Sequence, residues 1–126
     1  MSMRSSLGRV RGLGSAKEGA GHWWVQRLTA IALVPLSLWF VISVIGLIGV
    51  DHAALRAWMG LPGNTAMMVL FLGTLFHHAQ LGAQVVIEDY VHGEAAKTAG
   101  IITVKLLAWA LGVFSIVAVL KVAFGG

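Results

Sequence analysis

Three long apolar segments, separated by short polar ones, run along this chain. The first covers residues 25–50, and beyond Arg27 it carries no charged residue for more than 20 positions. The second covers about residues 65–88 and the third about residues 99–124. A helix of roughly 20 apolar residues crosses the hydrocarbon core of a bilayer. The pattern therefore predicts an all-α integral membrane protein with three transmembrane helices.

Two polar connections separate the predicted spans. Residues 51–64 read DHAALRAWMGLPGN and close on Leu61-Pro62-Gly63-Asn64, which is typical of a turn. Residues 89–97 form a shorter polar connection. Pro35 lies inside the first span and predicts a local bend, which membrane helices tolerate when neighbours satisfy the freed carbonyl.

The composition agrees with a membrane location. Hydrophobic residues make up 58% of the chain and charged residues 11%, whereas soluble domains average about 25% charged residues. Nucleic acid is excluded as a partner because so apolar a chain has almost no surface left for it. There is no cysteine, which rules out disulfides and cysteine-ligated iron–sulfur clusters within this chain.

Basic residues are concentrated at the start of the chain. Residues 1–21 are interpreted as a basic, flexible cytoplasmic tail and residues 22–126 as the membrane anchor domain. The apolar segment that follows is too long for a secretory signal peptide. Positive charge stays on the cytoplasmic side, so we expect a cytoplasmic N-terminus and an external C-terminus. The basic residues of the tail are Arg4, Arg9, Arg11 and Lys17.

Two adjacent histidines, His77 and His78, lie within the second apolar segment. An ionisable ring at membrane depth is costly, and it usually faces a bundle interior, a cavity or a cofactor. Asp89 and Tyr90 follow His78 by eleven and twelve residues, or about 18 Å along a helix. That distance leads from the middle of the membrane to the cytoplasmic interface. We interpret His78 as a metal or haem ligand, with a polar ligand site above it.

The neighbours of His78 allow two interpretations. His77 points about 100° away on a helix, so both rings cannot face one partner. Gly82 lies one turn after His78 on the same face and would leave a flat clearing for a porphyrin. The alternatives are a glycine used for helix packing and a hydrogen-bonded core histidine.

A polar stripe marks the entry of the first span, where Gln26, Arg27 and Thr29 lie close together in the sequence. Arg27 either reaches out to lipid headgroups or lines a site shared with Asp89 and Tyr90, and the sequence favours neither.

The second span resembles a known family. Residues 78–93, HAQLGAQVVIEDYVHG, resemble the haem- and quinone-bearing segment of the small membrane anchor, or D subunit, of succinate dehydrogenase (respiratory complex II). Residues 19–30, GAGHWWVQRLTA, are similar to its bacterial branch. The resemblance extends from about Ser15 onward.

The resemblance implies a subunit with no catalytic residue of its own, in the bacterial cytoplasmic membrane. In the family a flavoprotein with FAD oxidises succinate, an iron–sulfur subunit passes electrons on, and two anchors hold haem b and bind ubiquinone. By resemblance, His78 is one axial haem ligand and Tyr90, beside Asp89, donates to a quinone carbonyl. The second, cytochrome b-type anchor would supply the other ligand and complete a haem-binding bundle.

Two alternatives remain open at this point. One is a fumarate reductase anchor that works with menaquinol. The other is a non-redox membrane assembly subunit, in which His78 is a hydrogen-bonded core residue and Asp89-Tyr90 is a helix terminus.

Overall fold

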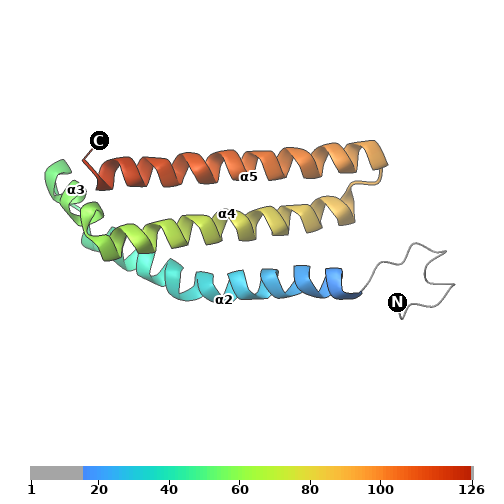
Figure 1. Ribbon diagram of the computed structural model, residues 1–126, viewed down its shortest axis with the longest axis horizontal. Helices are drawn as coiled ribbons and strands as arrows, with labels where there is room; N and C mark the ends of the chain where they lie inside the picture. The colour runs from blue at the N-terminus through green and yellow to red at the C-terminus, as the bar shows by residue number, and fades with distance from the viewer. Residues whose placement is uncertain (1–15, 126) are drawn as a thin grey trace.

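The computed structural model describes residues 16–125, with side chains from residue 21 onward, and every regular element in this part of the chain is helical. Three of the helices contain segments long and apolar enough to cross a membrane, which confirms the three predicted spans. The helices are α2 (Ala16–Gly46), α3 (His52–Gly60), α4 (Pro62–Tyr90) and α5 (Glu94–Ala123) (Figure 1).

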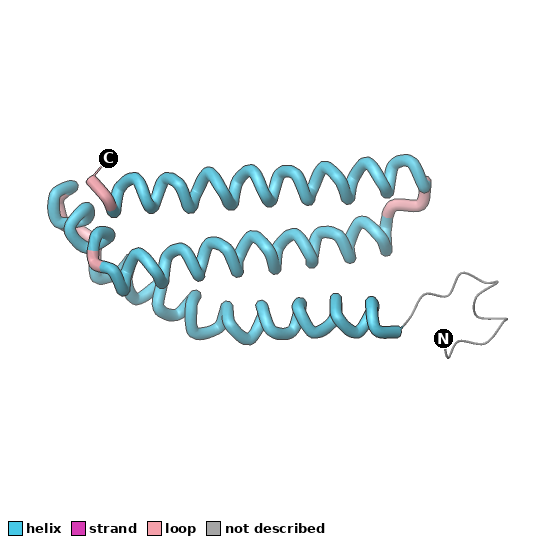
Figure 2. The backbone as a smooth tube through the Cα atoms, viewed as in Figure 1, coloured by secondary structure: helices cyan, strands magenta, loops and turns pink. Residues whose placement is uncertain are grey.

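The long helix α4 lies between α2 and α5 (Figures 1 and 2). It packs against both of them, whereas α2 and α5 make no group of contacts with each other among residues 16–125. The start of α2, the end of α4 and the start of α5 lie at one end of the molecule, called here the Tyr90 end (Figure 1). The short helix α3 and the end of α5 lie at the opposite end, called the α3 end.

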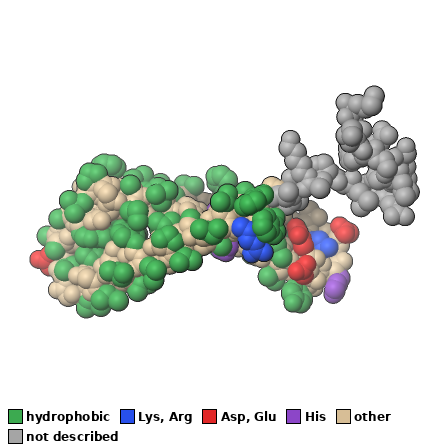
Figure 3. Space-filling model, turned by 90° about the horizontal axis from the view of Figure 1, so that it is seen from below, with side chains coloured by type: hydrophobic (Ala, Val, Ile, Leu, Met, Phe, Trp, Pro, Cys, Tyr) green, Lys and Arg blue, Asp and Glu red, His purple; other side chains and the backbone are tan. Residues whose placement is uncertain are grey.

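The apolar surface of the molecule is mostly on the outside. Few large side chains are buried, and they sit where α4 meets its neighbours; Phe71 of α4 stacks on Phe40 of α2 at 4.7 Å between ring centroids. Trp109 and Phe114 of α5 are 70% and 74% exposed. Hydrophobic side chains cover most of the face seen in Figure 3. A helix that is apolar all round belongs in lipid or against other apolar helices.

The first span differs from its predicted limits at both ends. α2 begins at Ala16, inside the segment 1–21 interpreted as a tail, and residues 1–15 lie outside the described part of the chain. The helix ends at Gly46 rather than near Val50, because the chain turns there and Gly49 adopts a φ of 85°. Glycine has no Cβ and adopts such angles at little cost. α2 contains Pro35 and changes direction along its length (Figure 1), as the proline predicts.

The first connection, residues 51–64, is not a simple loop, since it contains the helix α3. Asp51 caps this helix by accepting a hydrogen bond from the backbone N–H of Ala54 at 2.8 Å. Trp58 of α3 stacks on Trp39 of α2, with ring centroids 5.9 Å apart. The segment is too short and too polar to span a membrane, so the hydropathy pattern missed it. The second connection was predicted to cover residues 89–97. It is shorter, since only residues 91–93 separate α4 from α5.

Candidate functional site

A hydrogen bond joins α2 to α4 at His78. The Nδ1 atom of His78 lies 2.9 Å from the hydroxyl oxygen of Thr29. The same hydroxyl is 2.8 Å from the carbonyl oxygen of Val25 and 3.0 Å from that of Gln26. The His78 ring is half-buried. The predicted ligand is therefore anchored at one ring nitrogen, at the contact between two membrane helices.

Gly82 lies one turn further along α4, beside open space. A Cβ atom built on it would meet no atom within 4 Å outside its own helix backbone. Two other glycines behave differently: a Cβ on Gly100 would lie 3.4 Å from Ile87, and one on Gly112 would lie 3.5 Å from Phe76. Gly82 therefore makes no close helix contact within the described part of the chain, and the packing alternative would require a helix of another chain.

A cavity of about 450 Å³ opens between α2 and α4 next to Gly82. We call it the Arg27 cavity. The guanidinium of Arg27 lies 5.3 Å from the ring centroid of Trp23, which is within cation–π range. The side-chain oxygen of Gln26 is buried and has no hydrogen-bond partner among the described residues. The cavity lining combines basic, aromatic and small residues: His22, Trp23, Gln26, Arg27, Gly82 and Val85.

Asp89 and Tyr90 lie at the Tyr90 end, outside the Arg27 cavity. Both are exposed, and Tyr90 is the last residue of α4 with 76% of its surface accessible. Along α4, Asp89 is four residues, or about 6 Å, beyond the cavity-lining Val85. Arg27 does not lie at the start of its helix, because eleven residues of α2, Ala16 to Gln26, precede it. The common site for Arg27, Asp89 and Tyr90 stays a prediction.

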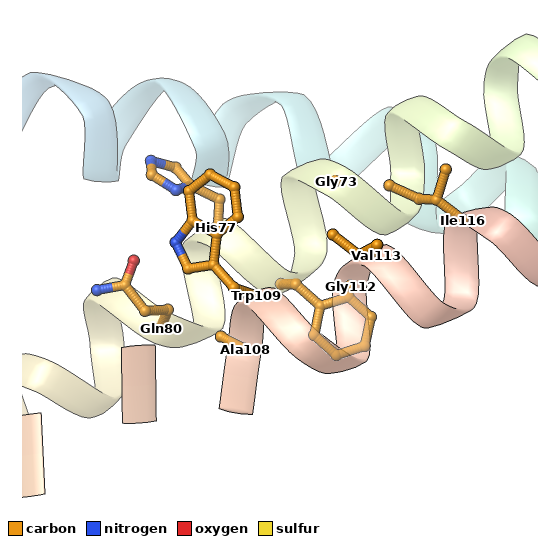
Figure 4. A pocket seen from close by; sticks show the side chains of 9 residues that line it. Gly73, His77, Gln80, Ala108, Trp109, Gly112, Val113 and Ile116 are labelled. Carbon is orange, nitrogen blue, oxygen red and sulfur yellow. The ribbon is translucent and has the colours of Figure 1, made fainter. Parts of the chain in front are cut away.

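His77 faces a different part of the molecule. It is exposed and lines a second cavity of about 320 Å³ between α4 and α5, together with the buried Gln80 and with Trp109 (Figure 4). The predicted divergence of the two adjacent histidines is therefore confirmed.

A polar ladder on α4 was missed in the sequence. The amide nitrogen of Gln80 donates to Gln84 at 3.2 Å, and that of Gln84 donates to Glu88 at 3.0 Å. The four-residue spacing of these three polar side chains in an apolar segment was the available signal. Thr29 was noticed only as part of a polar stripe, since nothing in the sequence shows which residue of α4 it meets.

These features define a class of protein before any comparison: a multi-pass membrane protein with a half-buried histidine and a basic cavity where two spans meet. Residues 1–120 match the family model described as succinate dehydrogenase/fumarate reductase transmembrane subunit, and the chain belongs to this family.

Curated relatives agree with this assignment. The chain is 37% identical over 116 residues to the succinate dehydrogenase hydrophobic membrane anchor subunit of Rickettsia bellii, covering 92% of this chain and 93% of the relative. It is 33% identical over 116 residues to the protein of the same name from Paracoccus denitrificans, with 92% and 89% covered. The membrane anchor subunit of Reclinomonas americana is 33% identical over 95 residues, with 73% and 79% covered. No solved structure matches the chain.

Proposed function

We propose that this chain is the small membrane anchor of a bacterial succinate:ubiquinone oxidoreductase, located in the cytoplasmic membrane. The relatives described above are named as succinate dehydrogenase anchors, which favours this direction over fumarate reduction. The partners are a flavoprotein with FAD, an iron–sulfur subunit and a second, cytochrome b-type anchor. The exposed apolar faces of α2 and α5 suit contact with that anchor and with lipid.

His78 is proposed as one axial ligand of haem b. The single observation that carries this proposal is the arrangement around its ring: one nitrogen is held by Thr29, and Gly82 leaves open space one turn away. Within residues 16–125, no group of three or more His, Asp or Glu side chains is placed to bind a metal ion. A haem iron needs only one side chain from each of two anchors, and a bound b-type haem supplies one-electron redox chemistry.

The Arg27 cavity suits the polar edge of the proposed haem b. A haem carries carboxylate side chains, and Arg27 and His22 both line the cavity as potential donors to them. The unpartnered Gln26 side-chain oxygen, by contrast, is an acceptor and needs a donor from a bound molecule, a water or a partner chain. In this role Arg27 would bind a haem carboxylate and so orient the haem beside His78.

Tyr90 and Asp89 are proposed as parts of the ubiquinone-reduction site, with Arg27 as a further candidate. Reduction places negative charge on the quinone carbonyl oxygens, and a positioned donor stabilises that charge. The phenol of Tyr90 can donate a hydrogen bond, and its exposure leaves it accessible to a quinone or to the partner subunits. Asp89 would hold a basic partner or pass protons from the cytoplasmic water.

The Tyr90 end is proposed to face the cytoplasm. Of the nine lysines and arginines, two, Arg56 and Lys121, belong to the α3 end. The other seven fall in residues 1–27 or in the first half of α5. This asymmetry follows the positive-inside rule, and with this orientation the proposed quinone site would lie on the side of the soluble subunits.

Purification tests the proposal directly. An affinity-tagged chain, extracted in mild detergent from its native membrane, should copurify with a flavoprotein, an iron–sulfur protein and a second anchor. The preparation should show a b-type absorbance spectrum, and extraction should release ubiquinone. Menaquinone as the bound species would instead favour the fumarate reductase anchor. A preparation free of haem and of redox partners would indicate a non-redox assembly subunit.

A further inference from the structure

The hydroxyl group of Thr29 has three oxygen or nitrogen neighbours but only one proton. Two of the neighbours are carbonyl oxygens of its own helix, at 2.8 and 3.0 Å, and the third is the Nδ1 atom of His78 at 2.9 Å. A carbonyl oxygen can only accept. Threonines in membrane helices commonly donate to the carbonyl three or four residues earlier. With its proton used in this way, the hydroxyl oxygen has lone pairs to offer His78.

We infer that Thr29 is a positioning residue that selects the tautomer of His78. In this arrangement the Nδ1–H of His78 donates to the Thr29 hydroxyl, and the lone pair is left on Nε2. Only a ring nitrogen with a free lone pair can bind iron, and the hydrogen bond at the other nitrogen decides which one it is. The inference rests on the proposed role of His78 as a haem ligand.

The local structure suits Thr29 to this role. Threonine is branched at Cβ, which restricts rotation about χ1, so the hydroxyl has a well-defined place on α2. The hydrogen bond connects α2 and α4 across residues 49 positions apart, and it orients the ring relative to both helices. A hydroxyl is also a neutral acceptor. It therefore interacts with the imidazole ring more weakly than a carboxylate at the same place would.

The test compares three variants in the assembled complex. Thr29→Val keeps the size and branching of the side chain but removes the acceptor, while Thr29→Ser keeps the hydroxyl. Thr103→Val is the matched control: the Thr103 hydroxyl, exposed on α5, donates to the Ala99 carbonyl at 2.7 Å, so the same type of helix bond is lost in a helix that holds neither Thr29 nor His78.

The readouts are the haem content of each complex, the low-spin electron paramagnetic resonance signal and carbon monoxide binding by the reduced haem. We expect Thr29→Val to assemble but to retain haem about 10- to 100-fold more weakly, with a high-spin fraction that binds carbon monoxide. Thr29→Ser and Thr103→Val should both resemble the unmodified complex. Carbon monoxide reports an open axial position, so a purely structural role for Thr29 would not produce it.

A low-spin Thr29→Val complex with full haem content and no carbon monoxide binding would overturn the inference. If Thr29→Val does not assemble, Thr29→Ala is measured in its place, and failure of both to assemble would make Thr29 an assembly residue instead. His78→Ala distinguishes the two levels of the argument. An unchanged haem spectrum in His78→Ala would overturn the proposed assignment of His78 as a ligand. If the His78→Ala spectrum changes but the Thr29→Val complex behaves like the unmodified one, only the role of Thr29 is overturned.

Discussion

His77 and His78 are neighbours in the sequence but lie on different faces of α4. His78 reaches the Thr29 hydroxyl of α2 at 2.9 Å, whereas His77 lines the cavity that α4 forms with α5. The rotation of about 100° between consecutive helical residues produces this separation. Each of the two histidines is therefore a natural control for the other.

Replacing His78 with alanine should remove one axial bond and change the b-type spectrum of the purified complex. Replacing His77 with alanine should leave the spectrum nearly intact, because its ring lines a different cavity, between α4 and α5. Absorbance and electron paramagnetic resonance spectra measure both effects. A strong response to the His77 change with none to the His78 change would show that the wrong histidine has been assigned.

Gly82→Leu should assemble but lose haem. The chain itself leaves open space at this glycine, so the new side chain would project into the space proposed for the cofactor rather than into a neighbouring helix. Gly73→Leu is the control. Gly73 is also in α4 beside open space, but it lines the second cavity, between α4 and α5, together with His77. The measurement is haem per complex. Equal haem loss in both variants would indicate general disturbance of α4.

Tyr90→Phe should slow quinone reduction while leaving succinate oxidation intact. The change deletes one donor from an exposed ring and so disturbs little packing within the described part of the chain. Losing a hydrogen bond to a developing negative charge costs about 2–3 kcal/mol, or tens- to hundredfold in rate. The rate with quinone should fall, and the rate with a soluble dye that takes electrons from the hydrophilic subunits should not. Parallel losses in both assays would give Tyr90 an assembly role.

Asp89→Asn separates two functions of the acid. If the carboxylate only holds a basic partner, quinone reduction should fall less than in Tyr90→Phe. If it passes protons, the fall should be larger, and solvent deuterium should slow the unmodified complex more than the variant. Full quinone activity in Asp89→Asn would remove Asp89 from the site.

The orientation can be read from reporter fusions. A reporter active only in the cytoplasm should work when fused after Lys97, since the α4–α5 connection belongs to the proposed cytoplasmic end. A reporter active only outside the membrane should work when fused after Gly126. The reverse pattern would place the Tyr90 end outside and would separate it from a cytoplasmic iron–sulfur partner.

The number and type of the elements were accessible from the sequence because hydropathy is a local property. Long uncharged segments specify membrane helices almost independently of their neighbours. The divergent orientation of His77 and His78 was accessible for the same reason, since the rotation per residue in a helix is constant. The helix α3 was missed because its stability depends on contacts such as the stacking of Trp58 on Trp39, which joins separate elements.

The sequence by itself determined three membrane helices, a histidine at membrane depth and an acid–phenol pair at the end of the same helix. Only the tertiary structure decided that Thr29 meets His78 and that Arg27 lines one cavity with Gly82 and Val85. The register between two apolar helices depends on how their side chains pack, and many registers bury similar apolar area. Hydropathy is the same in each of them, so it cannot choose among them.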